Sequence, residues 1–302
     1  MDAMPPTWLE AALNGAWTRA RQPRIPVTVA EVVEAGAACA AEGAAILHFH
    51  AYDEDTGRQR DDWRIYARII EGLRARTDAV LYPTVPGRAT EGADRFAHIR
   101  ELAARGLLEW TVLDPGSVNM AALSSPARGS VYANPPEELG AMAGFCAARR
   151  LHPGFAIYEP GFTRAGAALA RAAGMPRPIY RFMFTDRLGW GFPPRPAFLD
   201  AHLALLAECD PGAPWMVAGL DVDLSPLLAQ AAARGGGLRA GLEDAPLGTE
   251  LDNAALVRAA ARHARRLAAP AEVRAALRGQ ERPEERPQGR PPGPEGAWRA
   301  AP

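Results

Sequence analysis

The chain has 302 residues, of which 48% are apolar and 23% are charged, and its formal net charge is −1 at pH 7. This is the composition of a folded globular protein, and the near-neutral charge gives no reason to expect nucleic acid or a membrane surface as a partner. All 34 basic residues are arginines, which excludes Schiff-base chemistry through a lysine amine.

Short apolar runs alternate with longer helical patterns along most of the chain. Eight of the runs are typical of buried strands, and they span residues 8–15, 44–51, 78–85, 107–114, 154–161, 178–185, 214–221 and 237–244. One helical pattern begins after Thr28, a favourable N-cap, and another opens at 135–138 with two prolines and two glutamates. A third pattern begins at Asn253 and ends in arginines, which suit a helix C-terminus.

Eight strands alternating with eight helices predict a single-domain (β/α)8 TIM barrel over residues 1–278. The rival is a doubly wound open sheet, but no GxGxxG fingerprint follows the first strand. The glycines at 235–237 precede a strand, so we interpret them as a turn. Residues 279–302 are rich in Pro, Glu, Arg and Gly, and we expect a disordered C-terminal tail that takes no part in the chemistry.

Cys39, Cys146 and Cys209 are widely spaced, odd in number and placed in helical patterns. They predict reduced core thiols of a cytoplasmic protein rather than a disulfide framework. Residues 1–15 lack the basic segment that precedes the apolar core of a signal peptide, and no apolar run is long enough to cross a bilayer. We therefore expect a cytoplasmic protein without a membrane anchor.

The second strand pattern carries two histidines, His48 and His50, in the stretch AAILHFHA. Residues at i and i+2 of a strand point to the same face, and at the end of a barrel strand that face lines the active site. Two imidazoles are part of a ligand set for zinc or a similar divalent ion. The alternative is a chance pair, with one ring packed and the other exposed. The other histidines are expected at the surface: His98, His152, His202 and His263.

The eighth strand pattern ends in two adjacent acids, Glu243 and Asp244, and Arg239 precedes them. Alternation places Arg239 and Glu243 on one face. A glutamate at the end of the last barrel strand can reach across the mouth toward the histidines of the second strand. Taken alone, the acids could equally cap the next helix, but together with the two histidines they favour a metal site.

Several motifs show a resemblance to a known family over roughly residues 8–278. The chain resembles the β-keto acid cleavage enzymes, typified by 3-keto-5-aminohexanoate cleavage enzyme. The motifs that carry the resemblance are AALNGAWTRARQPRIPVT, ILHFHAYDEDTGR, DPGSVN, YANPPEEL, IYEPGF, WMVAGL, LRAGLEDAP and DNAALV.

The resemblance implies that His48, His50 and Glu243 bind Zn²⁺ or another divalent metal and that Arg239 and Asp244 are catalytic. It further implies that Asp244 takes the α-proton of a β-keto acid while Arg239 orients it or holds the substrate carboxylate. The carbanion then attacks the thioester of acetyl-CoA, and a retro-Claisen step gives acetoacetate and a new acyl-CoA. The family also implies a homo-oligomer, specifically a tetramer, with only small molecules as substrates.

Four positions depart from the family pattern. Pro83 stands where the family has a serine, with Thr84 beside it, and Ala156 stands where the family has a glutamate of a proton relay. Trp17 stands where the first loop is commonly acidic, and GLDVDL at 219–224 replaces a Gly-Arg-Trp-His-like segment. Because an indole suits an uncharged tail better than an ammonium, we expect an aminated substrate to be disfavoured.

Five residues are candidate substrate contacts: Trp17, Tyr82, Thr84, Asn119 and Glu159. Asn119 could equally hold the loop after the fourth strand. Because of Ala156, two functional alternatives stay open. One is a metal-dependent C–C lyase or hydrolase that does not use CoA, and the other is a non-catalytic barrel that binds a metabolite.

Overall fold

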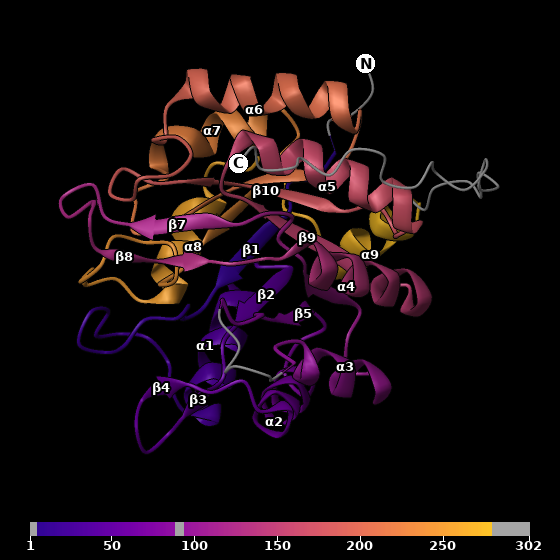
Figure 1. Ribbon diagram of the computed structural model, residues 1–302. Helices are drawn as coiled ribbons and strands as arrows, with labels where there is room; N and C mark the ends of the chain where they lie inside the picture. Colours follow the sequence, from indigo (N-terminus) through magenta and orange to yellow (C-terminus); the bar gives the residue numbers. More distant parts are fainter. Residues whose placement is uncertain (1–4, 88–93, 280–302) are drawn as a thin grey trace.

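Eight parallel strands form the central barrel of the computed structural model, which describes residues 5–87 and 94–279 (Figure 1). They are hydrogen-bonded in the order β5-β2-β1-β12-β11-β10-β9-β6. Their bounds are β1 (Leu9–Ala12), β2 (Ile46–Phe49), β5 (Val80–Pro83), β6 (Trp110–Val112), β9 (His152–Ile157), β10 (Ile179–Phe184), β11 (Trp215–Gly219) and β12 (Gly237–Ala240). The predicted (β/α)8 barrel is confirmed.

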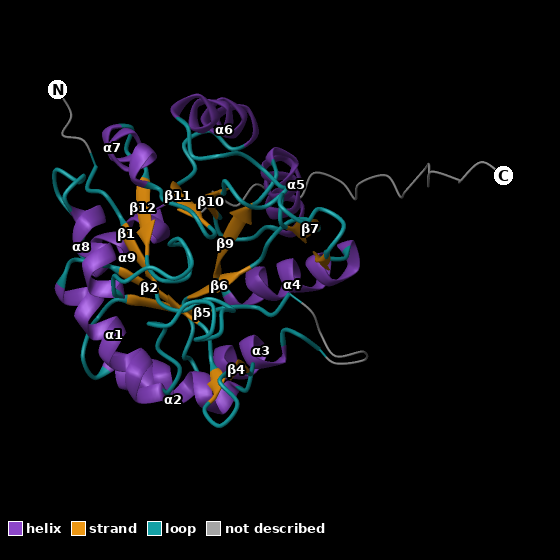
Figure 2. Ribbon diagram, turned by 90° about the vertical axis from the view of Figure 1, so that its left-hand side faces the viewer, coloured by secondary structure: helices purple, strands orange, loops and turns teal. Residues whose placement is uncertain are grey.

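Helices surround the strands, as Figure 2 shows. They are α1 (Val29–Ala41), α2 (Trp63–Arg74), α3 (Ala97–Ala104), α4 (Pro136–Arg149), α5 (Pro160–Ala173), α6 (Pro196–Cys209), α7 (Ser225–Ala233), α8 (Asn253–Ala261) and α9 (Pro270–Gly279). The start predicted for α1 is confirmed, because Thr28 and Glu31 form a reciprocal capping box. The start predicted for α4 is also confirmed, with Pro136 in its first turn. Helix α8 ends at Ala261, earlier than the arginine-rich pattern indicated.

The strands are shorter than the apolar runs that predicted them, because only part of each run pairs within the sheet, and β9 begins two residues before its run. Two hairpins were not predicted, and both leave the C-terminal ends of barrel strands. The first pairs β3 (Tyr52–Asp53) with β4 (Arg58–Gln59), and the second pairs β7 (Val118–Ala121) with β8 (Gly129–Tyr132). Their strands are short and partly polar, so they give little periodic signal.

Three histidines expected at the surface are buried, which corrects that prediction. His98, His152 and His202 are 3%, 9% and 1% exposed, whereas His263 is exposed as expected. His98 Nε2 is 2.8 Å from the carbonyl oxygen of Thr84. The imidazole of His202 in α6 stacks on Phe182 at 4.5 Å between ring centroids, so it packs as a flat aromatic group. A neutral imidazole can therefore fill core space that the sequence pattern reserves for apolar residues.

Strands β5 and β6 are the two ends of the hydrogen-bonded series, and they come together at a seam that completes the barrel. Tyr82 of β5 stacks on Trp110 of β6 with ring centroids 4.8 Å apart. At the base of the seam, Arg274 of α9 donates to the carbonyl oxygen of Asp78 at 2.6 Å and to Glu109 at 2.6 Å. Helix α9 thus connects the N-terminal ends of β5 and β6, which are not hydrogen-bonded to each other.

The three cysteines are free, as predicted, with Cys39 and Cys146 buried and Cys209 partly exposed. Among the described residues, none of the helices has both the length and the apolar character needed to cross a membrane. The predicted tail lies outside the described residues from position 280 onward, and Gly279 is the last residue of α9.

Candidate metal centre and active site

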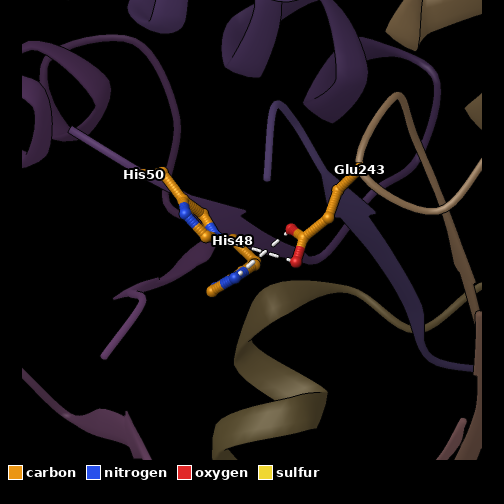
Figure 3. A group of neighbouring side chains, drawn as sticks. All are labelled: His48, His50 and Glu243. Carbon is orange, nitrogen blue, oxygen red and sulfur yellow. Dashed lines mark ion pairs between the residues drawn. The ribbon is translucent and has the colours of Figure 1, made fainter. Parts of the chain in front are cut away.

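Two neighbours of β1 in the sheet bring the predicted metal ligands together. His48 lies in β2, His50 follows it directly, and Glu243 follows β12 on the opposite side of β1. Nε2 of His48 is 3.3 Å from Oε2 of Glu243, and Nε2 of His50 is 3.6 Å from Oε1 (Figure 3). The ligand atoms that these residues offer all lie within 4.8 Å of one another.

The other ring nitrogen of each histidine faces a hydrogen-bond acceptor. Nδ1 of His48 is 3.3 Å from the carbonyl oxygen of Tyr82, and Nδ1 of His50 is 3.0 Å from Oε1 of Gln59. With the proton on Nδ1, each ring would direct the lone pair of Nε2 at Glu243. Burial also holds the pKa of His48 well below its ordinary value, so this ring is neutral.

Glu243 presents a charged carboxylate to the two imidazoles. Burial opposes its ionisation, but the guanidinium of Arg239, 3.0 Å from Oε1, holds its pKa well below the ordinary range. Oε2 of Glu243 and Nε2 of His50 have no hydrogen-bond partner among the described residues. A cation placed between these two atoms would satisfy both of them. Two imidazoles and one carboxylate are a donor set that fits zinc or a similar divalent ion.

The first loop fixes the positions of these ligands. The side chain of Asn14 accepts from the backbone N–H of His50 at 2.8 Å and donates to the carbonyl oxygen of His50 at 3.1 Å. Gly15 has a φ of +62°, and a Cβ at this position would lie 2.6 Å from Cγ of Glu243. A glycine is therefore required here both by the left-handed backbone and by the close approach of Glu243.

Arg239 and Asp244 form a fork-to-fork pair beside the metal ligands. Nη2 of Arg239 donates to Oδ1 of Asp244 at 2.8 Å, and Nε donates to Oδ2 at 3.0 Å. The backbone N–H of Gly219 also donates to Oδ2 at 3.0 Å. Burial raises the pKa of Asp244 to about 6, although Arg239 opposes this shift. Asp244 is therefore a carboxylate with a pKa close to neutral, held in one orientation.

A buried polar cluster lies next to these residues, and the sequence analysis did not identify it. Glu10 of β1 accepts from Nη1 of Arg239 at 2.9 Å and from the hydroxyl of Tyr82. The Tyr82 hydroxyl accepts from Arg181 of β10 at 2.7 Å. Glu10 and Arg181 are charged residues inside otherwise apolar strand runs, and this feature of the sequence could have predicted the buried cluster. An inward-facing charge in such a run must be paired inside the barrel.

The five candidate substrate contacts lie in different environments. Trp17 borders the metal centre, because its indole N–H donates to the carbonyl oxygen of Glu243 at 2.9 Å. Tyr82 is fully buried and stacks on His48 at 4.5 Å between ring centroids, so it supports a candidate metal ligand. Thr84 is 8% exposed just beyond β5. Asn119 is exposed on hairpin strand β7. Glu159 precedes α5 without a side-chain capping bond, and it accepts from the Gly191 N–H at 3.2 Å.

The barrel retains a carboxylate near Ala156, the position at which the family's glutamate is missing. Asp114, which follows β6, accepts from the backbone N–H of Ala156 at 2.6 Å and from the hydroxyl of Tyr132 at 2.7 Å. Nη2 of Arg181 lies 3.8 Å from the same carboxylate. Burial raises the pKa of Asp114. Asp114 therefore places an acidic group against the backbone at this point of β9.

Comparison with known proteins identifies a family that covers nearly the whole chain. The model of the beta-keto acid cleavage enzyme family matches residues 6–278. The 3-oxoadipate:acetyl-CoA acetyltransferase of Cupriavidus necator is 27% identical over 241 residues, covering 79% of this chain and 80% of the relative. The 3-keto-5-aminohexanoate cleavage enzyme of Fusobacterium nucleatum is 24% identical over 240 residues, covering 78% of this chain and 81% of the relative.

A third relative is the 3-dehydrocarnitine:acetyl-CoA trimethylamine transferase of Rhizobium meliloti, 26% identical over 261 residues, with 78% of this chain and 82% of the relative covered. Among solved structures, the apo structure of ObcA matches with a TM-score of 0.68 and 18% sequence identity. The match covers 87% of this chain and 67% of ObcA. At this identity the likeness shows a shared fold.

Proposed function

This chain belongs to the beta-keto acid cleavage enzyme family, and we propose that it is a metal-dependent acyltransferase that exchanges an acyl group between a β-keto acid and acetyl-CoA. The observation that carries the metal dependence is the convergence of three acceptor atoms. Nε2 of His48 and Nε2 of His50 lie 3.3 and 3.6 Å from the carboxylate of Glu243, and Nε2 of His50 has no hydrogen-bond partner among the described residues. A divalent ion held by these three side chains would act as a Lewis acid toward the keto and carboxylate oxygens of the substrate.

Asp244 is the general base in this proposal. Its pKa of about 6 lies near neutral pH, so it is ionised there yet basic enough to accept a proton from the α-carbon of a β-keto acid. Arg239 orients it, because three of the guanidinium N–H groups already bind Asp244 and Glu10. This arrangement favours Arg239 as a positioning residue over Arg239 as the holder of the substrate carboxylate.

Acetyl-CoA is the second substrate, and this assignment rests on the relatives whose names include it. The α-carbon, once deprotonated, bonds to the acetyl carbonyl carbon, and the CoA thiolate passes to the original keto carbon. The bond between that carbon and the α-carbon breaks, and the α-carbon regains its proton. The products are a new acyl-CoA and acetoacetate, so atoms and charge balance without a further reactant.

The residues beside the metal centre indicate which substrate tail is accepted. The guanidinium carbon of Arg21 lies 4.7 Å from the centroid of the Trp17 ring, and Trp17 contacts Glu243. The Arg21 guanidinium already lies over the indole, so an ammonium or trimethylammonium tail there would meet a like charge, whereas a neutral or anionic tail would not. We therefore propose a neutral or anionic β-keto acid as the substrate, in agreement with the expectation from Trp17.

The test is an assay of acetoacetate formation over a panel of β-keto acids with neutral, anionic and cationic tails, each with and without acetyl-CoA. We expect acetoacetate only when acetyl-CoA is present, and the lowest kcat/KM for the cationic tails. Cleavage that proceeds without acetyl-CoA would instead support the lyase or hydrolase alternative. Binding of β-keto acids without turnover would support the non-catalytic alternative.

The chain organisation that accompanies this function is a single catalytic domain over residues 1–278, a tail from residue 279, and a homo-oligomer. The family model, which ends at residue 278, supports the domain boundary. Light scattering on the full chain and on a chain truncated after residue 279 tests both points. We expect the two forms to have the same subunit number and the same activity, since the proposed site lies within the barrel.

A further inference from the structure

The most informative unexplained contact near the metal centre is the one between His50 and the hairpin that follows it. After the turn that follows β3, the chain returns in β4 and places the side chain of Gln59 against the ring of His50. Two further polar side chains, Asp61 and Tyr66, continue this contact away from the metal centre.

We propose that Gln59, oriented by Asp61 and Tyr66, is the positioning residue that fixes the metal-binding tautomer of His50. The proposal rests on the metal site of the proposed function, and it adds residues to which neither the family match nor the relatives' names assign a role. Each hydrogen bond in the series fixes the direction of the next.

The series begins at the Tyr66 hydroxyl. Tyr66 is fully buried, and burial raises its pKa well above the ordinary value, so the hydroxyl keeps its proton. It donates to Oδ1 of Asp61 at 2.7 Å. Asp61 also accepts from Nε2 of Gln59, at 3.0 Å to each carboxylate oxygen. An ionised carboxylate can only accept, so the NH₂ group of Gln59 must face Asp61.

The orientation of Gln59 then determines the proton position on His50. With its NH₂ on Asp61, the amide presents Oε1 to Nδ1 of His50 at 3.0 Å. Nδ1 must donate, and Nε2 therefore keeps its lone pair toward Glu243. The backbone of His50 is held separately by Asn14, so Gln59 acts on the ring and its tautomer.

His48 provides an internal contrast. Its Nδ1 faces the carbonyl oxygen of Tyr82, a main-chain group of the neighbouring barrel strand. No side-chain substitution at position 59 changes that acceptor. A loss of the Gln59 contact should therefore change the tautomer of His50 while His48 keeps its own. Partners of this kind typically contribute about 10–100-fold to metal affinity.

The test uses the full chain without metal, with long-range ¹H–¹⁵N spectra of the imidazoles recorded at about pH 8, above the ordinary imidazole pKa. His50→Ala assigns the His50 signals. We expect the Nδ1–H form for both His48 and His50 in the unaltered protein. Gln59→Leu should shift His50 toward the Nε2–H form and leave His48 unchanged, and Asp61→Asn should give a smaller shift of His50, because the amide of Gln59 can then turn over.

Zn²⁺ affinity, measured by competition with a chelating dye, is the second readout. We expect Gln59→Leu to weaken Zn²⁺ binding by about 10–100-fold. The matched control is Gln230→Leu. Gln230 of α7 also donates to a carboxylate, that of Asp200, but it makes no contact with His50. The Gln230→Leu protein should bind Zn²⁺ with the same affinity as the unaltered protein. An unaltered protein with His50 in the Nε2–H form, or a Gln59→Leu protein with unchanged tautomer or affinity, overturns the proposal. If the unaltered protein binds no Zn²⁺, the proposed function fails, and the tautomer spectra still decide the role of Gln59.

Discussion

At the scale of single residues, the site depends on how two imidazole rings are turned. His48 and His50 each direct Nδ1 at an oxygen atom and Nε2 at the Glu243 carboxylate, so the three side chains can together act as acceptors for a cation. The sequence predicted which residues meet, because alternation along a strand places His48 and His50 on one face. It could not predict Gln59 as their partner, because that contact depends on a hairpin whose strands are two residues each.

Gly15→Ala tests how closely the first loop is fitted to the metal ligand. The new Cβ would lie 2.6 Å from Cγ of Glu243, so the carboxylate must move away from the histidines. We expect Zn²⁺ affinity to fall by at least about tenfold. Losses of this order are typical when the residues that orient a metal ligand are changed. The measurement is the same dye competition, performed on folded protein.

Gly106→Ala is the control for backbone strain. Gly106 has a φ of +67°, close to that of Gly15, but a Cβ there would meet nothing within 4 Å. Both variants bear the cost of a left-handed alanine, about 1–2 kcal/mol. Equal Zn²⁺ affinities for the two variants would show that Glu243 is not confined by Gly15.

At the scale of elements, the barrel strands could be predicted from the sequence, whereas the two hairpins that follow β2 and β6 could not. The run at 78–85 contains β5 and the run at 154–161 overlaps β9, because buried parallel strands are apolar on both faces. The hairpins β3–β4 and β7–β8 have no such pattern. The buried side chain of His202 was also missed, because its environment comes from β10 and from residues beyond it, far from α6 in sequence.

Arg274→Ala tests the seam between β5 and β6. Arg274 bonds the carbonyl oxygens of Asp78 and Ala79 and the carboxylate of Glu109. Loss of these bonds should lower the free energy of unfolding by about 1–3 kcal/mol, toward the lower end because the Glu109 pair is partly exposed. Urea denaturation measures the change. Arg76→Ala, which removes an exposed pair with Glu34, should leave the urea midpoint nearly unchanged, and an equal effect of both variants would refute a special role for the seam.

His202→Leu tests the packing of α6 through its pH dependence. Burial lowers the pKa of His202 to about 4 from 6.5, so the folded protein excludes a proton that the unfolded chain accepts. The free energy of unfolding is therefore unaffected by this group above pH 6.5 and decreases as the pH falls toward 4. At pH 4.5, His202 should lower the free energy of unfolding by about 2 kcal/mol relative to pH 7.

The leucine variant should lose that part of the pH dependence. Urea denaturation at the two pH values, with a chelator present so that metal release does not contribute, gives the difference for each protein. A variant whose stability falls with pH as steeply as that of the unaltered protein would show that His202 is not the group responsible.

At the scale of the whole molecule, one interior cluster joins opposite sides of the barrel. Its charged members are four carboxylates and two guanidiniums: Glu10, Asp114, Glu243, Asp244, Arg181 and Arg239. The cluster has more carboxyl groups than guanidiniums, and burial raises the pKa of Asp114 and of Asp244. A divalent cation held beside them would favour their ionised forms, which is consistent with the proposed metal.

The proposed function requires that a metal ion held by His48, His50 and Glu243 takes part in the acyl exchange. The most direct test is acetoacetate formation from a neutral or anionic β-keto acid and acetyl-CoA, by protein first stripped of metal and then titrated with Zn²⁺. We predict no acetoacetate from the stripped protein, and a rate that rises in proportion to added Zn²⁺ until each chain holds an ion. A stripped protein that forms acetoacetate as fast as the reconstituted one would contradict the account.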